Sequence, residues 1–101
     1  MNKKHLPLFE VLTESTELQR RALLKTLTDV QLRAILEAVY NVLQGSCPLQ
    51  SKDKKKLFEH RAIIRRMVSK QHTDKQQKRL LNKYHDIIPL LLKPVLKALK
   101  R

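Results

Sequence analysis

Residues 29–44, DVQLRAILEAVYNVLQ, form the most regularly patterned stretch of the sequence and indicate its fold class. Thr28, directly ahead of this stretch, and Gln31 within it match a capping box. In this motif a hydroxyl and an amide side chain satisfy free backbone groups of the first helical turn. Gly45 follows where a C-cap with left-handed backbone belongs, and Pro48 prevents the helix from continuing. The sequence therefore predicts an α-helix over about residues 29–44. Its buried face should consist of the apolar residues spaced three and four apart, namely Leu32, Ile35, Leu36, Val39, Val42 and Leu43.

Three further helices are predicted from their start signals. Capping boxes of the same kind precede segments at about residues 17–25 (Thr16 and Gln19) and 74–84 (Thr73 and Gln76). Ser51 is a candidate N-cap for a single helix over about residues 52–70. In the first of these helices we expect the inward residues to be Leu18, Ala22 and Leu23, with Leu27 after its end.

The composition and the two ends of the chain complete the predicted architecture. One Gly and four Pro are too few turn residues for a β-rich fold, and the common residue types are good helix formers. Residues 85–101 are amphipathic, but Pro89 and Pro94 should limit them to short helical pieces. We therefore predict an all-α fold with one domain over residues 1–101: a compact four-helix bundle with a short amphipathic, proline-interrupted C-terminal helix. Apolar residues near the N-terminus should form one or two turns over the core: Leu6, Leu8, Phe9, Val11 and Leu12.

Positive charge is the strongest functional signal, and it is concentrated in the second half of the chain. The net charge is +13 over 101 residues, whereas solubility of a small domain requires a magnitude of only about 2–8. Residues 1–50 contain six Lys or Arg against five acids, a net charge of +1, and residues 51–101 contain sixteen against four, a net charge of +12. This asymmetry predicts a near-neutral scaffold half and a half that binds a polyanion.

The cations between residues 54 and 83 are predicted to form one exposed basic strip. Arg65 and Arg66 are adjacent and offer planar groups that pair well with phosphate oxygens. A solvated helix face is the simpler interpretation, but the acids that usually accompany such a face are missing. We therefore expect sequence-nonspecific binding and condensation of nucleic acid, with double-stranded DNA as the first candidate partner. The predicted binding residues are Lys54, Lys55, Arg61, Arg65, Arg66, Lys75, Lys78, Arg79 and Lys83.

Alternative functions remain open at this level. Reading of base edges by a helix-turn-helix is disfavoured, because the connection over residues 45–51 exceeds the usual turn of about 3–4 residues. A helical adaptor whose acidic protein partner covers the basic face is a further candidate, and the oligomeric state, including a homo-oligomer, is left open. The C-terminal segment fits either a last core helix or a cationic amphipathic element that docks on an anionic membrane. The membrane residues would be Leu91, Leu92, Lys93, Val95, Leu96, Lys97, Leu99 and Lys100.

Catalytic, metal and cofactor sites are not expected. Cys47 is the single cysteine and follows a helix end, and Gly45 is the single glycine, so no glycine-rich phosphate loop exists. The N-terminus lacks a signal-peptide pattern, which favours the nucleus or cytoplasm of a host, or a virion, over secretion. The histidines stand apart without metal-binding spacing: His5, His60, His72 and His85.

Five short motifs follow one another along the chain: Tyr40-Asn41-Val42-Leu43-Gln44-Gly45, Pro48-Leu49, a basic helix through Ile64-Arg65, Lys78-Arg79-Leu80-Leu81, and Ile88-Pro89-Leu90-Leu91-Leu92. Over about residues 25–97, their order and spacing resemble small basic proteins of Polinton/Maverick elements and the related adintoviruses, which are DNA elements with adenovirus-like virion genes. Those proteins often have a Gly-Gly pair before the proline-containing element, where this chain has His85-Asp86-Ile87-Ile88. The resemblance implies a virion-associated protein, either a DNA-packaging core protein or a membrane-active accessory protein.

Overall fold

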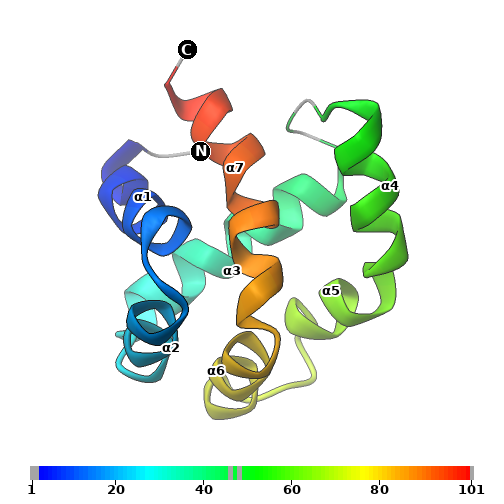
Figure 1. The fold of residues 1–101 in the computed structure, drawn as a ribbon. Coiled ribbons are helices and arrows are strands. Elements are labelled where there is room, and N and C mark those ends of the chain that lie inside the picture. Colours follow the sequence, from blue (N-terminus) through cyan, green and yellow to red (C-terminus); the bar gives the residue numbers. More distant parts are fainter. Residues whose placement is uncertain (1–2, 46, 48, 101) are drawn as a thin grey trace.

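The fold is all-α, as predicted. The computed structural model describes residues 3–45, 47 and 49–100, and every regular element in that part of the chain is helical (Figure 1). The predicted four-helix bundle with a C-terminal helix is not confirmed, because the described residues contain seven α-helices and two short 3-10 helices. The α-helices are α1 (Leu6–Glu14), α2 (Glu17–Lys25), α3 (Asp29–Leu43), α4 (Ser51–Glu59), α5 (Arg61–Met67), α6 (Asp74–Lys83) and α7 (Ile88–Leu99). The 3-10 helices are η1 (Lys3–His5) and η2 (His85–Ile87).

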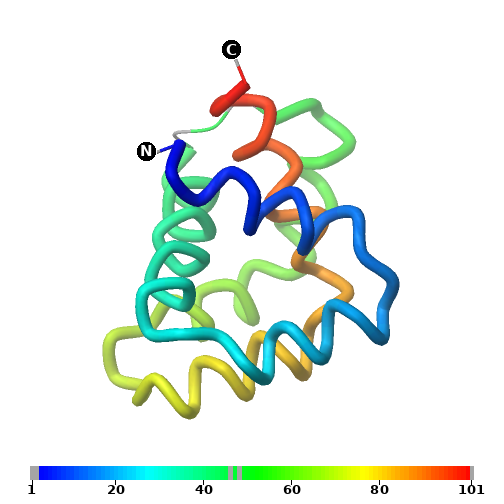
Figure 2. Tube along the Cα trace, turned by 90° about the vertical axis from the view of Figure 1, so that its left-hand side faces the viewer, coloured from blue at the N-terminus to red at the C-terminus, as the bar shows by residue number. Residues whose placement is uncertain are grey.

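The helices surround α7, the last one in the chain. Helix α7 packs against α1, α3 and α4, so segments from the two ends of the sequence lie together (Figure 1). Helices α2 and α6 form a second pair, and in Figure 2 they run side by side in opposite directions. Helix α5 contacts both α3 and α6 and thereby links the two groups.

Local capping sets three of the helix starts, as predicted. Thr16, Thr28 and Thr73 each accept a hydrogen bond from the backbone N–H three residues later, and the glutamine at that position accepts one from the threonine N–H. At Thr73, for example, Gln76 N lies 3.2 Å from the hydroxyl, and Thr73 N lies 2.8 Å from Gln76 Oε1. Gly45 adopts the predicted left-handed backbone with φ of 79°. The prediction for Ser51 was wrong, since it is the first helical residue and Gln50 occupies the N-cap without a side-chain hydrogen bond.

The single helix predicted over residues 52–70 is in fact two helices that meet at His60. The backbone there (φ −103°, ψ 12°) departs from α geometry, and His60 N–H bonds to the Leu57 carbonyl three residues back at 3.2 Å. The bend lets α4 pack on α7 while α5 turns toward α3 and α6. The apolar residues of α4 and α5 therefore contact different helices, which one straight helix would not reach together. The apolar side of the two helices is buried through Leu57, Ile64 and Met67.

The C-terminal segment is one helix and part of the core, not a series of short pieces. Pro89 lies in the first turn of α7, where a missing N–H costs nothing, whereas Pro94 lies inside the helix. Pro94 removes one backbone hydrogen bond, but its ring is buried with the rest of the apolar face, which offsets that loss. The apolar residues that the membrane alternative required to be free are all buried: Leu91, Leu92, Val95, Leu96 and Leu99.

The N-terminal helices also differ from prediction in the residues that they bury. The first apolar stretch is a full helix, α1, which buries Phe9 and Leu12 instead of adding only one or two turns. In α2 the predicted inward residue Leu18 is 80% exposed, and Leu24 is fully buried in its place. A short helix with few apolar residues has no single obvious apolar face, so the contact of α2 with α6 determines which of its residues are buried.

Capping provides a direct test of the helix starts. Thr28→Ala should lower the free energy of unfolding by about 1 kcal/mol, because the Gln31 backbone N–H loses its acceptor. Ser51→Ala is the matched control and should change it by less than about 0.5 kcal/mol, since Ser51 caps nothing. Urea denaturation followed by circular dichroism measures both variants. Equal losses would show that the assigned N-caps are wrong.

The central position of α7 provides a second test. Leu92→Ala should lower the free energy of unfolding by about 2–5 kcal/mol, because the side chain is fully buried and its removal leaves a cavity. Leu18→Ala makes the same chemical change at an exposed site and should cost less than about 0.5 kcal/mol. Thermal and urea denaturation compare the two. A small effect of Leu92→Ala would mean that α7 is not in the core.

Candidate nucleic-acid interface

A basic groove of about 440 Å³ runs between α2 and α6. Apart from Leu24 and Asn82, all of its described lining residues are cationic. Four come from α6 and were predicted from the sequence, whereas the fifth comes from α2 and was not. The cations are Lys25, Lys75, Lys78, Arg79 and Lys83. We call this surface the α2–α6 groove.

The sequence of α6 explains why its cations share this groove. Lys75, Arg79 and Lys83 recur every four residues and therefore form a row along one helical face, with steps of about 6 Å along the axis. Lys25 ends α2, which runs antiparallel to α6 (Figure 2), and it lines the groove together with the α6 cations. Lys25 belongs to the near-neutral half of the chain, so that half also contributes a cation to the groove.

Two side chains hold α2 in place beside this groove. Asn82 Nδ2 donates a hydrogen bond of 3.1 Å to the Arg21 carbonyl, which links α6 directly to α2. Arg20 donates to the carbonyl of His85 at 3.2 Å and to that of Leu12 at 3.2 Å. It donates further to the Ser15 carbonyl at 3.3 Å, so this arginine joins three segments of the fold. Arg20 is therefore a structural cation, and its charge is not offered to a ligand.

Only one carboxylate neutralises the groove within the described part of the chain. Lys78 Nζ lies 3.9 Å from Asp29 Oδ1, at the N-terminus of α3, and the lysine side chain is 29% exposed. The other four groove cations make no ion pair among residues 3–45, 47 and 49–100, although Lys83 Nζ lies 5.4 Å from the centre of the Tyr84 ring. The groove therefore keeps most of its positive charge available to an anion.

The remaining predicted binding residues lie elsewhere. They are exposed on α4 and α5, which the bend at His60 turns relative to each other, and none of them lines the α2–α6 groove. One of them already has an internal partner, because the guanidinium carbon of Arg61 lies 4.6 Å from the centre of the Phe58 ring. The structure therefore divides the predicted strip into a groove group on α6 and a separate group: Lys54, Lys55, Arg61, Arg65 and Arg66.

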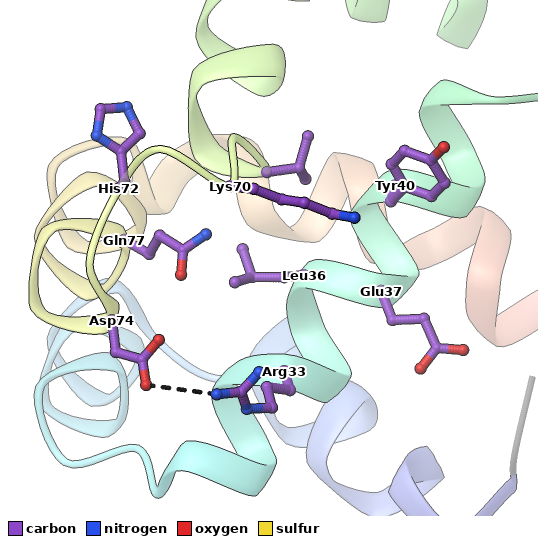
Figure 3. A pocket seen from close by; sticks show the side chains of 9 residues that line it. Arg33, Leu36, Glu37, Tyr40, Lys70, His72, Asp74 and Gln77 are labelled. Carbon is purple, nitrogen blue, oxygen red and sulfur yellow. Dashed lines mark ion pairs between the residues drawn. The ribbon is translucent and has the colours of Figure 1, made fainter.

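A larger pocket of about 590 Å³ lies between α3, α6 and the segment that joins α5 to α6, but its charges are balanced (Figure 3). Arg33 Nη2 lies 3.9 Å from Asp74 Oδ2, and the pocket lining contains Glu37 as well as Lys70. Gln77 is buried, and its Nε2 donates to the Met67 and Ser69 carbonyls at 3.4 and 3.3 Å. These bonds fix the end of α5 to α6, so the pocket belongs to the scaffold more than to a polyanion site.

The outward side of α7 carries the cations of the C-terminal segment. Lys93, Lys97 and Lys100 line a shallow pocket of about 410 Å³ together with Asp53, and Lys100 Nζ lies 3.9 Å from Glu10 Oε1. With the leucines of α7 buried, this surface lacks the apolar half that membrane docking needs. None of the described helices combines the length and the apolar character needed to cross a bilayer.

Among the described residues, no cluster of His, Cys, Asp and Glu could hold a metal ion. Cys47 is buried, and desolvation raises the pKa of its thiol above the ordinary value, which disfavours the nucleophilic thiolate. His85 Nε2 lies 3.5 Å from Glu17 Oε1, while its buried Nδ1 lacks a hydrogen-bond partner.

Comparisons of this chain with protein-family models, curated proteins and solved structures found no match. The function has to be inferred from the geometry and charge described above.

Proposed function

We propose that this protein binds the phosphate backbone of nucleic acid, double-stranded DNA first, through the α2–α6 groove. The observation that carries this proposal is the groove's lining of five cations, of which only Lys78 pairs with a carboxylate among the residues that the structure describes. Each phosphate that these cations neutralise would release condensed counterions, which is the main source of nonspecific affinity for DNA.

The chemistry of the groove favours binding without base selection. Four of its five cations are lysines, which act as flexible point charges, and only Arg79 has the planar fork that reads guanine edges or pairs bidentately with phosphate. Phosphate contacts of this kind position a protein on a duplex without reading its sequence. Binding should therefore vary strongly with salt and little with base composition.

We extend the proposal to DNA condensation in a virion or mobile element, on the resemblance of residues 25–97 alone. Lys55, Arg65 and Arg66 of α4 and α5 would contact a second stretch of backbone, because they lie on other helices than the groove. A protein with two separate basic surfaces can bring two DNA segments together, which is what condensation requires.

Neutralising the groove tests the proposed site. The triple variant Lys25→Gln, Lys75→Gln, Arg79→Gln removes three exposed groove cations that make no internal ion pair. Each lost phosphate contact should reduce the slope of log affinity against log salt by about 0.9, so the slope should become shallower by up to about 2.7. Fluorescence anisotropy with a random-sequence duplex, repeated across a salt series, measures the slope.

The matched control variant has the same net charge as the groove triple variant. Lys93→Gln, Lys97→Gln, Lys100→Gln removes three cations from the outward face of α7 and should leave the slope nearly unchanged. If both triple variants lose the same affinity and slope, binding follows net charge and the groove is not the site. A further triple, Arg61→Gln, Arg65→Gln, Arg66→Gln, measures the share of the α4 and α5 group.

The single carboxylate at the groove gives a prediction of opposite sign. Asp29→Asn frees Lys78 and removes a negative charge beside the phosphates, so duplex affinity should rise by about two- to fivefold, the scale of a surface ion pair. The variant should also lose about 0.3–1 kcal/mol of stability, because Asp29 interacts favourably with the N-terminus of α3. Glu37→Gln, the control, makes the same charge change in the balanced pocket and should raise affinity less. An equal rise in both variants would contradict the groove assignment.

A further inference from the structure

An exposed aromatic side chain lies at the bend between α4 and α5. Phe58 is 66% exposed, although its neighbours Leu57 and Ile64 are buried. Single exposed apolar residues are common on protein surfaces, so exposure alone indicates nothing. Here, however, the guanidinium of Arg61 lies over the ring at 4.6 Å, and the ring borders an apolar groove.

This second groove, the Phe58 groove, has a volume of about 230 Å³ and an aliphatic floor. The floor brings together α3, α4 and α7 through residues such as Val42, Leu57 and Leu91. Its only charged described lining residues are Lys54 and Arg61, and no carboxylate is among them. The Phe58 groove is therefore an apolar recess with a positive rim.

The chemistry of the recess excludes several occupants. A nucleobase would stack on Phe58, but the aliphatic floor offers no partner for its polar edge, whose burial unpaired costs about 1–3 kcal/mol. A second copy of this chain has a net charge of +13 and would be repelled at a cationic rim. The recess instead fits one or two large apolar side chains, provided that negative charge flanks them.

We propose that the Phe58 groove binds an acidic, amphipathic helical segment of a protein partner. Leu or Phe side chains of that segment would fill the recess against Phe58, and its carboxylates would pair with Lys54 and Arg61. The charge pairs would speed association and orient the segment, while the buried apolar anchor would supply most of the affinity.

This proposal goes beyond nucleic-acid binding and assigns a different role to two cations predicted as phosphate ligands. The Phe58 groove and the α2–α6 groove share no lining residue. The protein can therefore hold DNA on α2 and α6 while an acidic partner occupies α4 and α5. Such an arrangement would tether a partner to DNA.

The test uses the full chain and a labelled synthetic peptide of roughly four helical turns. In this peptide Leu occupies every third or fourth position, and Glu occupies the positions on the other helical face. One control peptide replaces every Leu with Ala, and a second control peptide replaces every Glu with Gln. Fluorescence anisotropy should show that the Glu/Leu peptide binds wild-type protein more tightly than either control does. Phe58→Ala should weaken that binding at least about tenfold, as expected for an aromatic anchor. Tyr40→Ala, which removes another half-exposed ring elsewhere, should not change it.

Several outcomes would overturn the proposal. Equal binding of the Ala and Leu peptides, or no effect of Phe58→Ala, would mean that net charge alone holds the peptide. A loss of DNA affinity in Phe58→Ala would identify the ring as a base-stacking platform, and Phe58-dependent self-association in sedimentation would identify a second copy as the occupant. Circular dichroism confirms that Phe58→Ala folds, which its exposure predicts.

Discussion

The apolar face of α7 is buried against α1, α3 and α4 at the same time, and the other helices are arranged around this contact. The sequence has only two Phe and two Tyr and no Trp, so the core depends on aliphatic side chains. Helix α7 supplies some of the most completely buried ones. Because burial of such side chains stabilises a fold by roughly 1.5–3 kcal/mol each, removal of this helix from the core would leave the remaining helices without their common partner.

The same contact decides where the charge of α7 lies. With the apolar residues of α7 inside, its lysines lie on the outer surface. The pairing of α2 with α6 then adds Lys25, from the near-neutral half, to the row on α6. The basic groove thus depends on the pairing of α2 with α6 as well as on the charge density of α6.

Two surfaces of different chemistry result. The α2–α6 groove is lined almost entirely by cations, which suits phosphates, whereas the Phe58 groove has an aliphatic floor with a positive rim, which suits an acidic amphipathic helix. The two surfaces share no described lining residue, because one is built on α2 and α6 and the other mainly on α3, α4, α5 and α7.

The sequence alone determined the all-α class, three helix starts and the left-handed Gly45, because capping boxes and glycine C-caps involve atoms only a few residues apart. It also identified four of the five groove cations, since spacings of three and four residues place them on one side of the helix whatever the rest of the fold does. Contacts between distant segments decided the rest: the bend at His60, the burial of Leu24 instead of Leu18, the uninterrupted α7 through Pro94, and the position of Lys25 beside α6. In each of these cases the local conformational preference of the residues is weak or even unfavourable, so the hydrophobic free energy of tertiary contacts outweighs it. The pattern of residues within one helix does not show which tertiary contacts form.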